Sequence, residues 1–282
     1  MILVFGSSGQ VGASLAGRDG VLSLGRAEAD LTDPEACAAA IRAHRPRAVI
    51  NAAAYTAVDK AESEENLAAA INGAAPGAMA RVAAELGIPF VHISTDYVFP
   101  GSGTAPHQVN DRTGPLGAYG RTKLAGEEAV RAAGGVHAIL RTSWVYSDHG
   151  ANFLKTMLRL SETRDHLTVV ADQIGGPTPA PAIADAVMII AEALVTDPSL
   201  SGTYHFSGAP DVGWADFARA IFAAAGRPVT VEDIPSSAYP TPAQRPGNSR
   251  MDCSATETAF GIARPDWQAT LPHMIKSITE TS

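Results

Sequence analysis

The sequence predicts an α/β fold: a Rossmann-like, doubly wound parallel sheet with a small, irregular C-terminal substrate-binding subdomain. The apolar residues 1–5 lead directly into a glycine-rich turn at residues 6–12, which is typical of a buried parallel strand that feeds a helix. Strand-like and helix-like segments then alternate through the first half of the chain, which predicts right-handed βαβ units. Connections rich in glycine, proline and serine become denser after about residue 171, which indicates a change of architecture.

The elements follow from short apolar runs and from helical spacing between them. The expected strands are residues 1–5, 21–24, 48–51, 90–93 and 138–141, and the expected helices are residues 10–16, 34–44, 67–86 and 118–132. Residues 182–195 contain two acids and are expected to form a core helix, not a membrane span. We expect residues 1–170 to form the cofactor-binding domain. Residues 171–282 are expected to form mainly the substrate-binding subdomain, with some elements returning to the sheet.

The glycine-rich turn predicts a dinucleotide-binding site. Its spacing is Gly-x-x-Gly-x-x-Gly, with one more residue between the first two glycines than in Gly-x-Gly-x-x-Gly. Glycines permit a tight turn and let a pyrophosphate approach the backbone, while the start of the helix offers free N–H groups. An ordinary strand-to-helix turn is the alternative, but the position after the first strand favours a cofactor. The expected contacts are Gly6, Gly9, Gln10, Val11 and Gly12.

Arg26 favours NADPH as the cofactor. An acid at the end of the second strand would bind the ribose hydroxyls of NAD, whereas an arginine accommodates the 2′-phosphate of NADP. The second expected strand is followed by Gly25 and Arg26, with no acid at that point. A solvated loop arginine is the alternative, and the sequence leaves open whether NADH is also accepted. Asp30 and Leu31 follow and are expected near the adenine.

Composition excludes several classes of partner. A net charge of −8 argues against nucleic acid or an anionic membrane. Cys37 and Cys253 lack metal or redox spacing, and no export signal is apparent, so a cytoplasmic location is expected. The eight histidines form no ligand-spaced pairs, so no metal site is predicted.

Polar residues follow the third and fourth expected strands, where the ligand of a doubly wound sheet binds. Small residues after Asn51 would let the nicotinamide half of a cofactor pass close to the backbone, although close helix–sheet packing explains them equally well. The expected contacts there are Ala54, Tyr55 and Thr56. After the fourth strand, Thr95 could hydrogen-bond a carbonyl oxygen and Asp96 a sugar hydroxyl. A cap or turn is the alternative for both residues.

Tyr119 and Lys123 are expected to be the catalytic pair. Four residues apart on a helix, they lie on one face, and an ammonium beside a phenol favours the phenolate. Such a tyrosine can protonate the alkoxide that forms when a carbonyl is reduced. The spacing by itself also arises by chance, so the surrounding motifs must support it.

These motifs, in this order, resemble the dTDP-4-dehydrorhamnose reductases, a branch of the extended short-chain dehydrogenase/reductases. The glycine turn and Tyr-x-x-x-Lys mark only the superfamily, whereas the longer strings are specific to the branch. The resemblance covers nearly the whole chain and rests on residues 9–12, 49–62, 94–99, 119–127, 141–146 and 245–250.

The resemblance implies hydride transfer from NADPH to C4 of a dTDP-4-keto-6-deoxy-L-sugar, which gives dTDP-L-rhamnose. It implies Tyr119 as the proton donor, Lys123 as the ligand of the nicotinamide ribose, and Thr95 as a residue that adjusts proton transfer. The implied substrate contacts are Thr95, Asp96, Trp144 and Asn152, with Arg245 and Asn248 at the nucleotide diphosphate. Taken alone, Trp144 would be read as a core aromatic residue.

The chain departs from the family at three positions. Ser14 and Val109 stand where members that dimerise through magnesium carry glutamates, so that bridge is not expected, and a monomer or a homodimer remains open. Ala255 stands where a lysine is frequent, with no consequence that we can derive.

A nucleotide-sugar epimerase or a 4,6-dehydratase is the rival enzyme, but a dehydratase would carry glutamate in place of Tyr97. A non-catalytic regulatory subunit of methionine adenosyltransferase is the rival from another class. The choice between a dTDP and a UDP substrate stays open.

Overall fold

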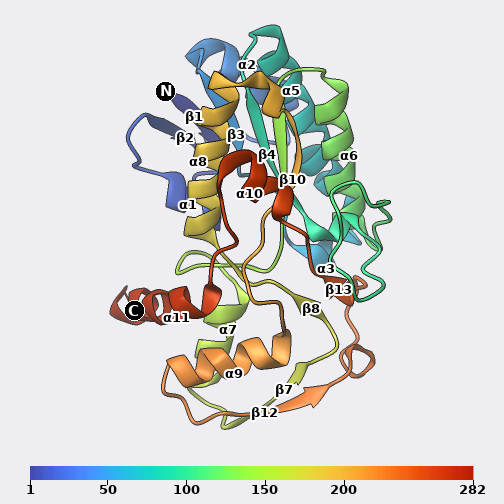
Figure 1. The fold of residues 1–282 in the computed structure, drawn as a ribbon, viewed down its shortest axis with the longest axis vertical. Coiled ribbons are helices and arrows are strands. Elements are labelled where there is room, and N and C mark those ends of the chain that lie inside the picture. The colour runs from blue at the N-terminus through green and yellow to red at the C-terminus, as the bar shows by residue number, and fades with distance from the viewer. Residues whose placement is uncertain (282) are drawn as a thin grey trace.

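A six-stranded parallel sheet forms the centre of the larger lobe in the computed structural model, which describes residues 1–281 (Figure 1). The strand order is β10-β5-β4-β3-β1-β2, and every neighbouring pair is parallel. The chain turns from β2 to the other side of β1, so the sheet has a switch point between β1 and β3. The strands are β1 (Ile2–Phe5), β2 (Val21–Leu24), β3 (Ala48–Asn51), β4 (Phe90–Thr95), β5 (His137–Thr142) and β10 (Gly202–His205). The predicted fold class and the five predicted strands are confirmed.

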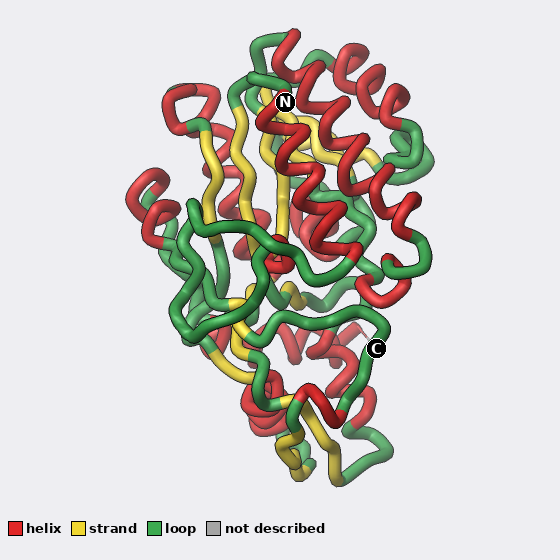
Figure 2. Tube along the Cα trace, turned by 90° about the vertical axis from the view of Figure 1, so that its right-hand side faces the viewer, coloured by secondary structure: helices red, strands yellow, loops and turns green. Residues whose placement is uncertain are grey.

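Helices cover both faces of this sheet (Figure 2). Alternation along β1 divides the core: Ile2 and Val4 pack with α8, whereas Leu3 and Phe5 pack with α2 and α5. The helices of this lobe include α1 (Gln10–Leu15), α2 (Pro34–His44), α5 (Ala75–Glu85), α6 (Ala118–Ala132) and α8 (Ala180–Thr196). Apolar residues on both faces of the central strands explain their continuous hydrophobic runs.

The helix expected at residues 67–86 contains one π-helical turn. Helix α4 (Glu65–Ala69) leads through the π-helix η1 (Ala70–Ala74) into α5, and the short α3 (Val58–Ala61) precedes them. Asn72 lies in the π turn, and its side chain bonds the backbone N–H and C=O of Tyr55. Single π turns inside α-helices are frequent at functional sites. Here the extra residue brings Asn72 to the segment that follows β3.

The smaller lobe has its own aromatic core. Tyr146, Phe217 and Trp267 are buried there, and β7 pairs in parallel with β12. Its main elements are α7 (Phe153–Leu160), β7 (His166–Val170), α9 (Trp214–Ala224), β12 (Thr230–Ile234) and α11 (Trp267–Thr281). Short strands join the lobes: β6 (Val145–Tyr146), β8 (Ile174–Gly175), β9 (Thr178–Pro179), β11 (Val212–Gly213) and β13 (Asn248–Ser249). The remaining elements are η2 (Asp96–Val98), η3 (Pro198–Leu200), η4 (Ser236–Ala238) and α10 (Ser254–Phe260).

The two lobes are built from interleaved parts of the chain (Figure 1). Helix α7 and strand β7 lie within residues 1–170 but pack in the smaller lobe, whereas α8 and β10 lie beyond residue 170 and belong to the sheet lobe. We therefore propose a division by packed core instead of by a single boundary. Within the described residues no helix is long and apolar enough to cross a membrane.

Candidate active site

Two glycines of the turn after β1, Gly6 and Gly12, are packed too closely for any side chain. A Cβ at Gly12 would lie 1.8 Å from the carbonyl oxygen of Gly6. Gly6 itself has φ +102°, and a Cβ there would lie 2.8 Å from the Ala53 backbone. The turn therefore lies against the segment after β3, at the switch point of the sheet. This is the cradle that a dinucleotide needs at that edge.

Gln10 connects this turn to the smaller lobe. Its Oε1 accepts from the Ser147 hydroxyl at 2.9 Å and from Asn152 Nδ2 at 3.0 Å. Asn152 Oδ1 accepts from the Lys155 N–H at 3.1 Å and so caps α7. Asn152, which we expected to contact the substrate, is thus occupied by Gln10 and by the cap. Its contacts place it beside the cofactor turn.

An acid that the sequence analysis overlooked lies at the end of β2. The Glu28 carboxylate folds back and accepts from the Gly25 N–H at 2.9 Å. Arg26 is exposed, 3.7 Å from Asp30 Oδ2, and the pKa of Asp30 is lowered chiefly by hydrogen bonds from Thr32. Leu31 is buried behind them. The expectation that no acid stands here is wrong, because a turn returns residue 28 to the strand end.

The segment after β3 is held by the buried amide of Asn72. Asn72 Oδ1 accepts from the Tyr55 N–H at 2.8 Å, while Nδ2 donates to the Tyr55 carbonyl and to the Thr122 hydroxyl, both at 3.1 Å. The Tyr55 hydroxyl bonds Glu64. Ala54 and Tyr55 are half-buried and Thr56 is exposed, so the segment presents its backbone at the sheet edge. A single asparagine in a helix of small residues gives no sequence signal for this role.

Tyr119 and Lys123 lie on one face of α6 but bind different partners. Lys123 is almost fully buried, and its Nζ donates to the Ile93 carbonyl at 2.7 Å and lies 3.3 Å from His92 Nε2. Burial raises the pKa of Tyr119 above its ordinary value, and a hydrogen bond from Thr95 only partly opposes the rise. The expected lowering by Lys123 is therefore wrong: the ammonium is directed to β4, and Tyr119 stays protonated at neutral pH.

Thr95 and Asp96 lie beside the Tyr119 hydroxyl, at the carboxyl end of β4. The Thr95 hydroxyl donates to Asp96 Oδ1 at 3.0 Å and accepts from the Tyr97 N–H at 3.2 Å. Burial raises the pKa of Asp96 to about 6, opposed by the Ser249 and Thr95 hydroxyls. Asp96 Oδ2 makes no hydrogen bond of normal geometry to the described residues. A buried oxygen of this kind is suited to a ligand hydroxyl.

A buried ion cluster fixes α6 against β4 and β5. Glu127 accepts from Ser94 at 2.6 Å, from Arg131 at 2.6 Å and from Arg141 at 2.9 and 2.7 Å. Burial alone would raise the pKa of Glu127, but the arginines and Ser94 hold it below its ordinary value. Gly120 also allows a close approach, since a Cβ there would lie 2.3 Å from the Tyr97 carbonyl oxygen. These contacts determine where Tyr119 meets Thr95.

Trp144 forms a flat aromatic surface where the two lobes meet. It has φ +48°, and its ring stacks on Trp214 with 3.5 Å between centroids and 10° between planes. Phe153 packs against Trp214 in turn. A Cβ at Gly175 would lie 2.7 Å from Trp144 Cε2, so this glycine keeps the ring in place. Trp214 and Gly175 escaped the sequence analysis because neither belongs to a recognisable motif.

Arg245 and Asn248 differ in what their side chains can still bind. Arg245 is half-buried, donates to Asp59 Oδ2 at 2.8 Å and lies near Tyr97. Asn248 Nδ2 donates to the Ala105 carbonyl at 2.8 Å, and its Oδ1 accepts from the Arg250 N–H at 3.2 Å. Asn248 is therefore occupied in holding the loop before α6, whereas Arg245 has further N–H groups for a ligand.

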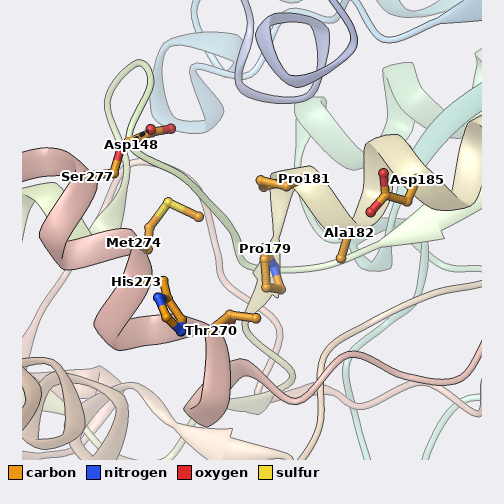
Figure 3. A pocket seen from close by; sticks show the side chains of 9 residues that line it. All are labelled: Asp148, Pro179, Pro181, Ala182, Asp185, Thr270, His273, Met274 and Ser277. Carbon is orange, nitrogen blue, oxygen red and sulfur yellow. Dashed lines mark hydrogen bonds between the residues drawn. The ribbon is translucent and has the colours of Figure 1, made fainter. Parts of the chain in front are cut away.

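A separate groove of about 390 Å³ lies between the start of α8 and α11 (Figure 3). Pro181 and Ala182 face His273 and Met274 across it, and it contains none of the predicted site residues.

Among the described residues no group of three His, Cys, Asp or Glu side chains could hold a metal ion. Ser14 bonds the Gln10 carbonyl, the Val109 carbonyl accepts from Arg141, and Ala255 is exposed on α10.

Comparison with known proteins places this site in one family. The family model described as "RmlD substrate binding domain" matches residues 1–280. The chain is 46% identical to the dTDP-4-dehydrorhamnose reductase of Sinorhizobium fredii (strain NBRC 101917 / NGR234) over 284 residues, 97% of this chain and 96% of that one. It is 41% identical to the enzyme of Escherichia coli (strain K12) over 297 residues, 100% and 99% of the two chains.

Solved structures agree with the sequence comparison. A dTDP-4-dehydrorhamnose reductase from Clostridium acetobutylicum superposes with a TM-score of 0.91 at 36% identity, over 99% of both chains. The enzyme from Bacillus anthracis, solved in complex with NADP, gives a TM-score of 0.89 at 33% identity, over 98% of both chains. With the glycine turn, the Thr95–Tyr119 contact and Lys123 already in place at the sheet edge, the full-length match shows that this chain belongs to the dTDP-4-dehydrorhamnose reductase family.

Proposed function

We infer that the protein reduces the C4 keto group of dTDP-4-dehydro-L-rhamnose (dTDP-6-deoxy-L-lyxo-4-hexulose) and forms dTDP-L-rhamnose, the last step of dTDP-rhamnose biosynthesis. The observation that supports this most directly is the Tyr119 hydroxyl beside Thr95, at the carboxyl end of β4 and on the same helix face as Lys123. A protonated phenol at that edge is the acid that a ketone reduction needs. The reductases of Sinorhizobium fredii and Escherichia coli align with 97% and 100% of the chain.

The cofactor proposal is NADPH, which when bound supplies the hydride. Gly12 packs against the Gly6 carbonyl and Gly6 against Ala53, which keeps the turn tight at the sheet edge where a pyrophosphate would bind. We propose that Arg26 contacts the 2′-phosphate, Asp30 and Leu31 lie at the adenine, and the backbone at residues 54–56 lies along the nicotinamide half. Glu28 and Asp30 reduce the positive charge around Arg26. NADH therefore belongs to the test as the competing cofactor.

Proton transfer is assigned to Tyr119. Its raised pKa keeps the phenol protonated, so it can donate to the C4 oxygen as negative charge develops there. The Thr95 hydroxyl, which donates to Asp96 Oδ1 in this structure, would rotate to donate to the phenolate that forms. A hydrogen bond with Thr95 lowers the pKa of Tyr119. Lys123 contributes a nearby positive charge when protonated and is placed to contact the nicotinamide ribose.

Substrate recognition is proposed for three side chains with free binding capacity. Asp96 Oδ2 would accept from a sugar hydroxyl, Trp144 would cover one face of the deoxysugar, and Arg245 would bind the diphosphate. Asn152 and Asn248 would act by holding the loops around them. A cytoplasmic site of action, and a monomer or homodimer without a magnesium bridge, are part of the proposal. The buried, unpaired Cys37 and Cys253 fit a reducing compartment.

The test is the oxidation of NADPH with dTDP-4-keto-L-rhamnose, followed by absorbance and by NMR identification of the sugar product. We expect turnover in the wild type and a loss of about 10²- to 10⁴-fold in Tyr119→Phe, the usual cost of losing a positioned acid. Tyr239→Phe is the matched control, because that tyrosine is 62% exposed and outside the site. Full turnover in Tyr119→Phe would exclude the assigned proton donor.

A further inference from the structure

Behind the catalytic pair, three buried polar side chains form a row from β3 through β4 to α6. Asn51 and His92 are fully buried and Lys123 is 1% exposed. Asn51 Nδ2 lies 3.2 Å from His92 Nδ1, and His92 Nε2 lies 3.3 Å from Lys123 Nζ. Neither Asn51 nor His92 has a role in the proton transfer described so far. The row leads directly to the amine that shares a helix face with Tyr119.

The orientation of the Asn51 amide is determined by the backbone. Asn51 Oδ1 accepts from the Ala53 N–H at 3.1 Å. Rotating the amide by 180° would place its NH₂ group against that N–H, donor against donor. Asn51 Nδ2 is therefore the atom that faces His92, and it can only donate. His92 Nδ1 must then be the acceptor of this hydrogen bond and carries no proton.

His92 consequently carries its single proton on Nε2. Burial, with the charge of Lys123, lowers the pKa of His92 well below its ordinary value, so the imidazole is neutral. Its Nε2–H is directed at Lys123 Nζ. An ammonium has three donors and no lone pair, whereas a neutral amine can accept this hydrogen bond and still donate to the Ile93 carbonyl.

The surrounding charges leave Lys123 without a carboxylate of its own. Glu127, one turn further along α6, is bound by both Arg141 and Arg131. On the Tyr119 side, Asp96 is buried with a raised pKa. The acidic groups on the segments packed against α6 have other partners. Glu62 accepts from the Ala118 N–H, Glu65 pairs with Arg121, and Glu64 bonds Tyr55 and Lys60. Asp59 pairs with Arg245, and Glu85 pairs with Arg42. Tyr97, on η2, lies toward Arg245.

We propose that Asn51 and His92 are a positioning pair that presents an N–H to Lys123 and stabilises its neutral amine. The amine is the state of Lys123 after it has given up a proton. Stabilising that state makes Lys123 a proton donor to the site and not only a fixed positive charge. The proposal rests on the proposed reductase function for its purpose, but the tautomer of His92 can be measured without any activity.

The first experiment is NMR of the ¹⁵N-histidine-labelled protein, with the His92 signals assigned by their loss in His92→Gln. We expect a neutral imidazole protonated on Nε2 between pH 6 and 9, and the opposite tautomer, protonated on Nδ1, in Asn51→Asp, whose carboxylate can only accept. A proton on Nδ1 in the wild type would overturn the proposal. The wild-type tautomer can be measured even if the Asn51 variants fold poorly. It can also be measured if the wild type shows no reductase turnover, and that absence of turnover would refute only the proposed function.

The second experiment follows Lys123 itself with ¹³Cε-lysine labelling, using Lys60, Lys155 and Lys276 as internal references. Burial lowers the pKa of Lys123 to about 8. Asn51→Asp reverses the hydrogen bond to His92 Nδ1 and adds a negative charge. Asn51→Leu removes the donor of that hydrogen bond and adds no charge. We expect both to raise the Lys123 titration, and the alkaline limb of kcat/KM, by about one pH unit, the worth of a hydrogen bond to a charged group. A shift in Asn51→Asp alone would assign the effect to charge and overturn the proposal. A fall in kcat in these variants, with the Lys123 titration and the alkaline limb of kcat/KM unchanged, would also overturn the proposal.

Discussion

Arg141 on β5 binds the Glu127 carboxylate of α6 through two hydrogen bonds, of 2.9 and 2.7 Å, inside the protein. Arg131 and Ser94 complete the coordination of the same carboxylate. The pair joins the helix that carries Tyr119 to the strand next to β4, so the catalytic geometry depends on a buried ion pair distant in sequence.

Removing the Glu127 charge should therefore be strongly destabilising. In Glu127→Gln the guanidinium of Arg141 remains buried without its counter-charge, which typically costs about 3–5 kcal/mol. Urea denaturation measures this free energy of unfolding. Glu65→Gln, which breaks the exposed pair with Arg121, is the control and should cost no more than about 1 kcal/mol. Equal losses in the two variants would contradict the structural role.

Asp96 should make the protein less stable as the pH rises. Its folded-state pKa is about 6 against an ordinary value of 3.8, so the native state binds the proton more tightly. The stabilisation is complete below the unfolded pKa and is lost as the pH rises through 6. Asp96→Asn has no carboxyl group at this position and does not lose this stabilisation. Its free energy of unfolding should therefore rise relative to that of the wild type between pH 4 and pH 8, by at most about 3 kcal/mol. Thermal unfolding across that range measures the difference, and parallel curves would refute it.

Gly175→Ala should displace Trp144. The new Cβ would lie 2.7 Å from Trp144 Cε2, so the stacked ring has to move. We expect the KM for the nucleotide sugar to rise about 10-fold, the lower end for a packing change in a binding pocket, while the KM for NADPH is unchanged. Tryptophan fluorescence reports the ring movement directly. Gly202→Ala is the control, because its Cβ would meet side-chain atoms only at 3.5 Å. An unchanged sugar KM would exclude Trp144 as a sugar contact.

Arg26 and Glu28 should shift cofactor preference in opposite directions. Arg26→Ala removes a charge that attracts the 2′-phosphate, and kcat/KM for NADPH should fall about 10-fold, a charge-assisted hydrogen bond being worth about 1.5–3 kcal/mol. Glu28→Gln removes a negative charge that repels the 2′-phosphate, so the ratio of kcat/KM for NADPH to kcat/KM for NADH should rise. The ratio of the two kcat/KM values measures both effects. If Arg26→Ala leaves that ratio unchanged, Arg26 is a solvated loop residue.

Local patterns were sufficient to predict five of the six strands of the sheet; the edge strand β10 (Gly202–His205) was not predicted. Strands β1 and β3 have apolar residues on both faces, so each appears as a continuous hydrophobic run that ends at a turn or a polar segment. Gly6, Gly12 and Thr95 were identified because each belongs to a segment that directly follows a predicted strand, and Tyr119 because it stands four residues before Lys123 on a helix.

The partners of those residues could not be predicted in the same way. Glu28 returns to Gly25 through a turn, Asn72 reaches Tyr55 from a π-helical turn, and Trp214 reaches Trp144 from the other lobe. Such contacts depend on how separate elements pack, which a motif does not encode. For the same reason, Asn152 and Asn248 were expected at the substrate, while in the structure their side chains are occupied by Gln10 and by the Ala105 carbonyl.

The sequence by itself determined the doubly wound sheet, the cofactor turn and the identity of the residues on the catalytic face of α6, because these follow from spacing along one element. Only the tertiary structure decided their protonation. Tyr119 remains a phenol, and Lys123 meets His92 instead of the tyrosine, because burial and the neighbouring strand β4 outweigh the spacing of four residues on the helix.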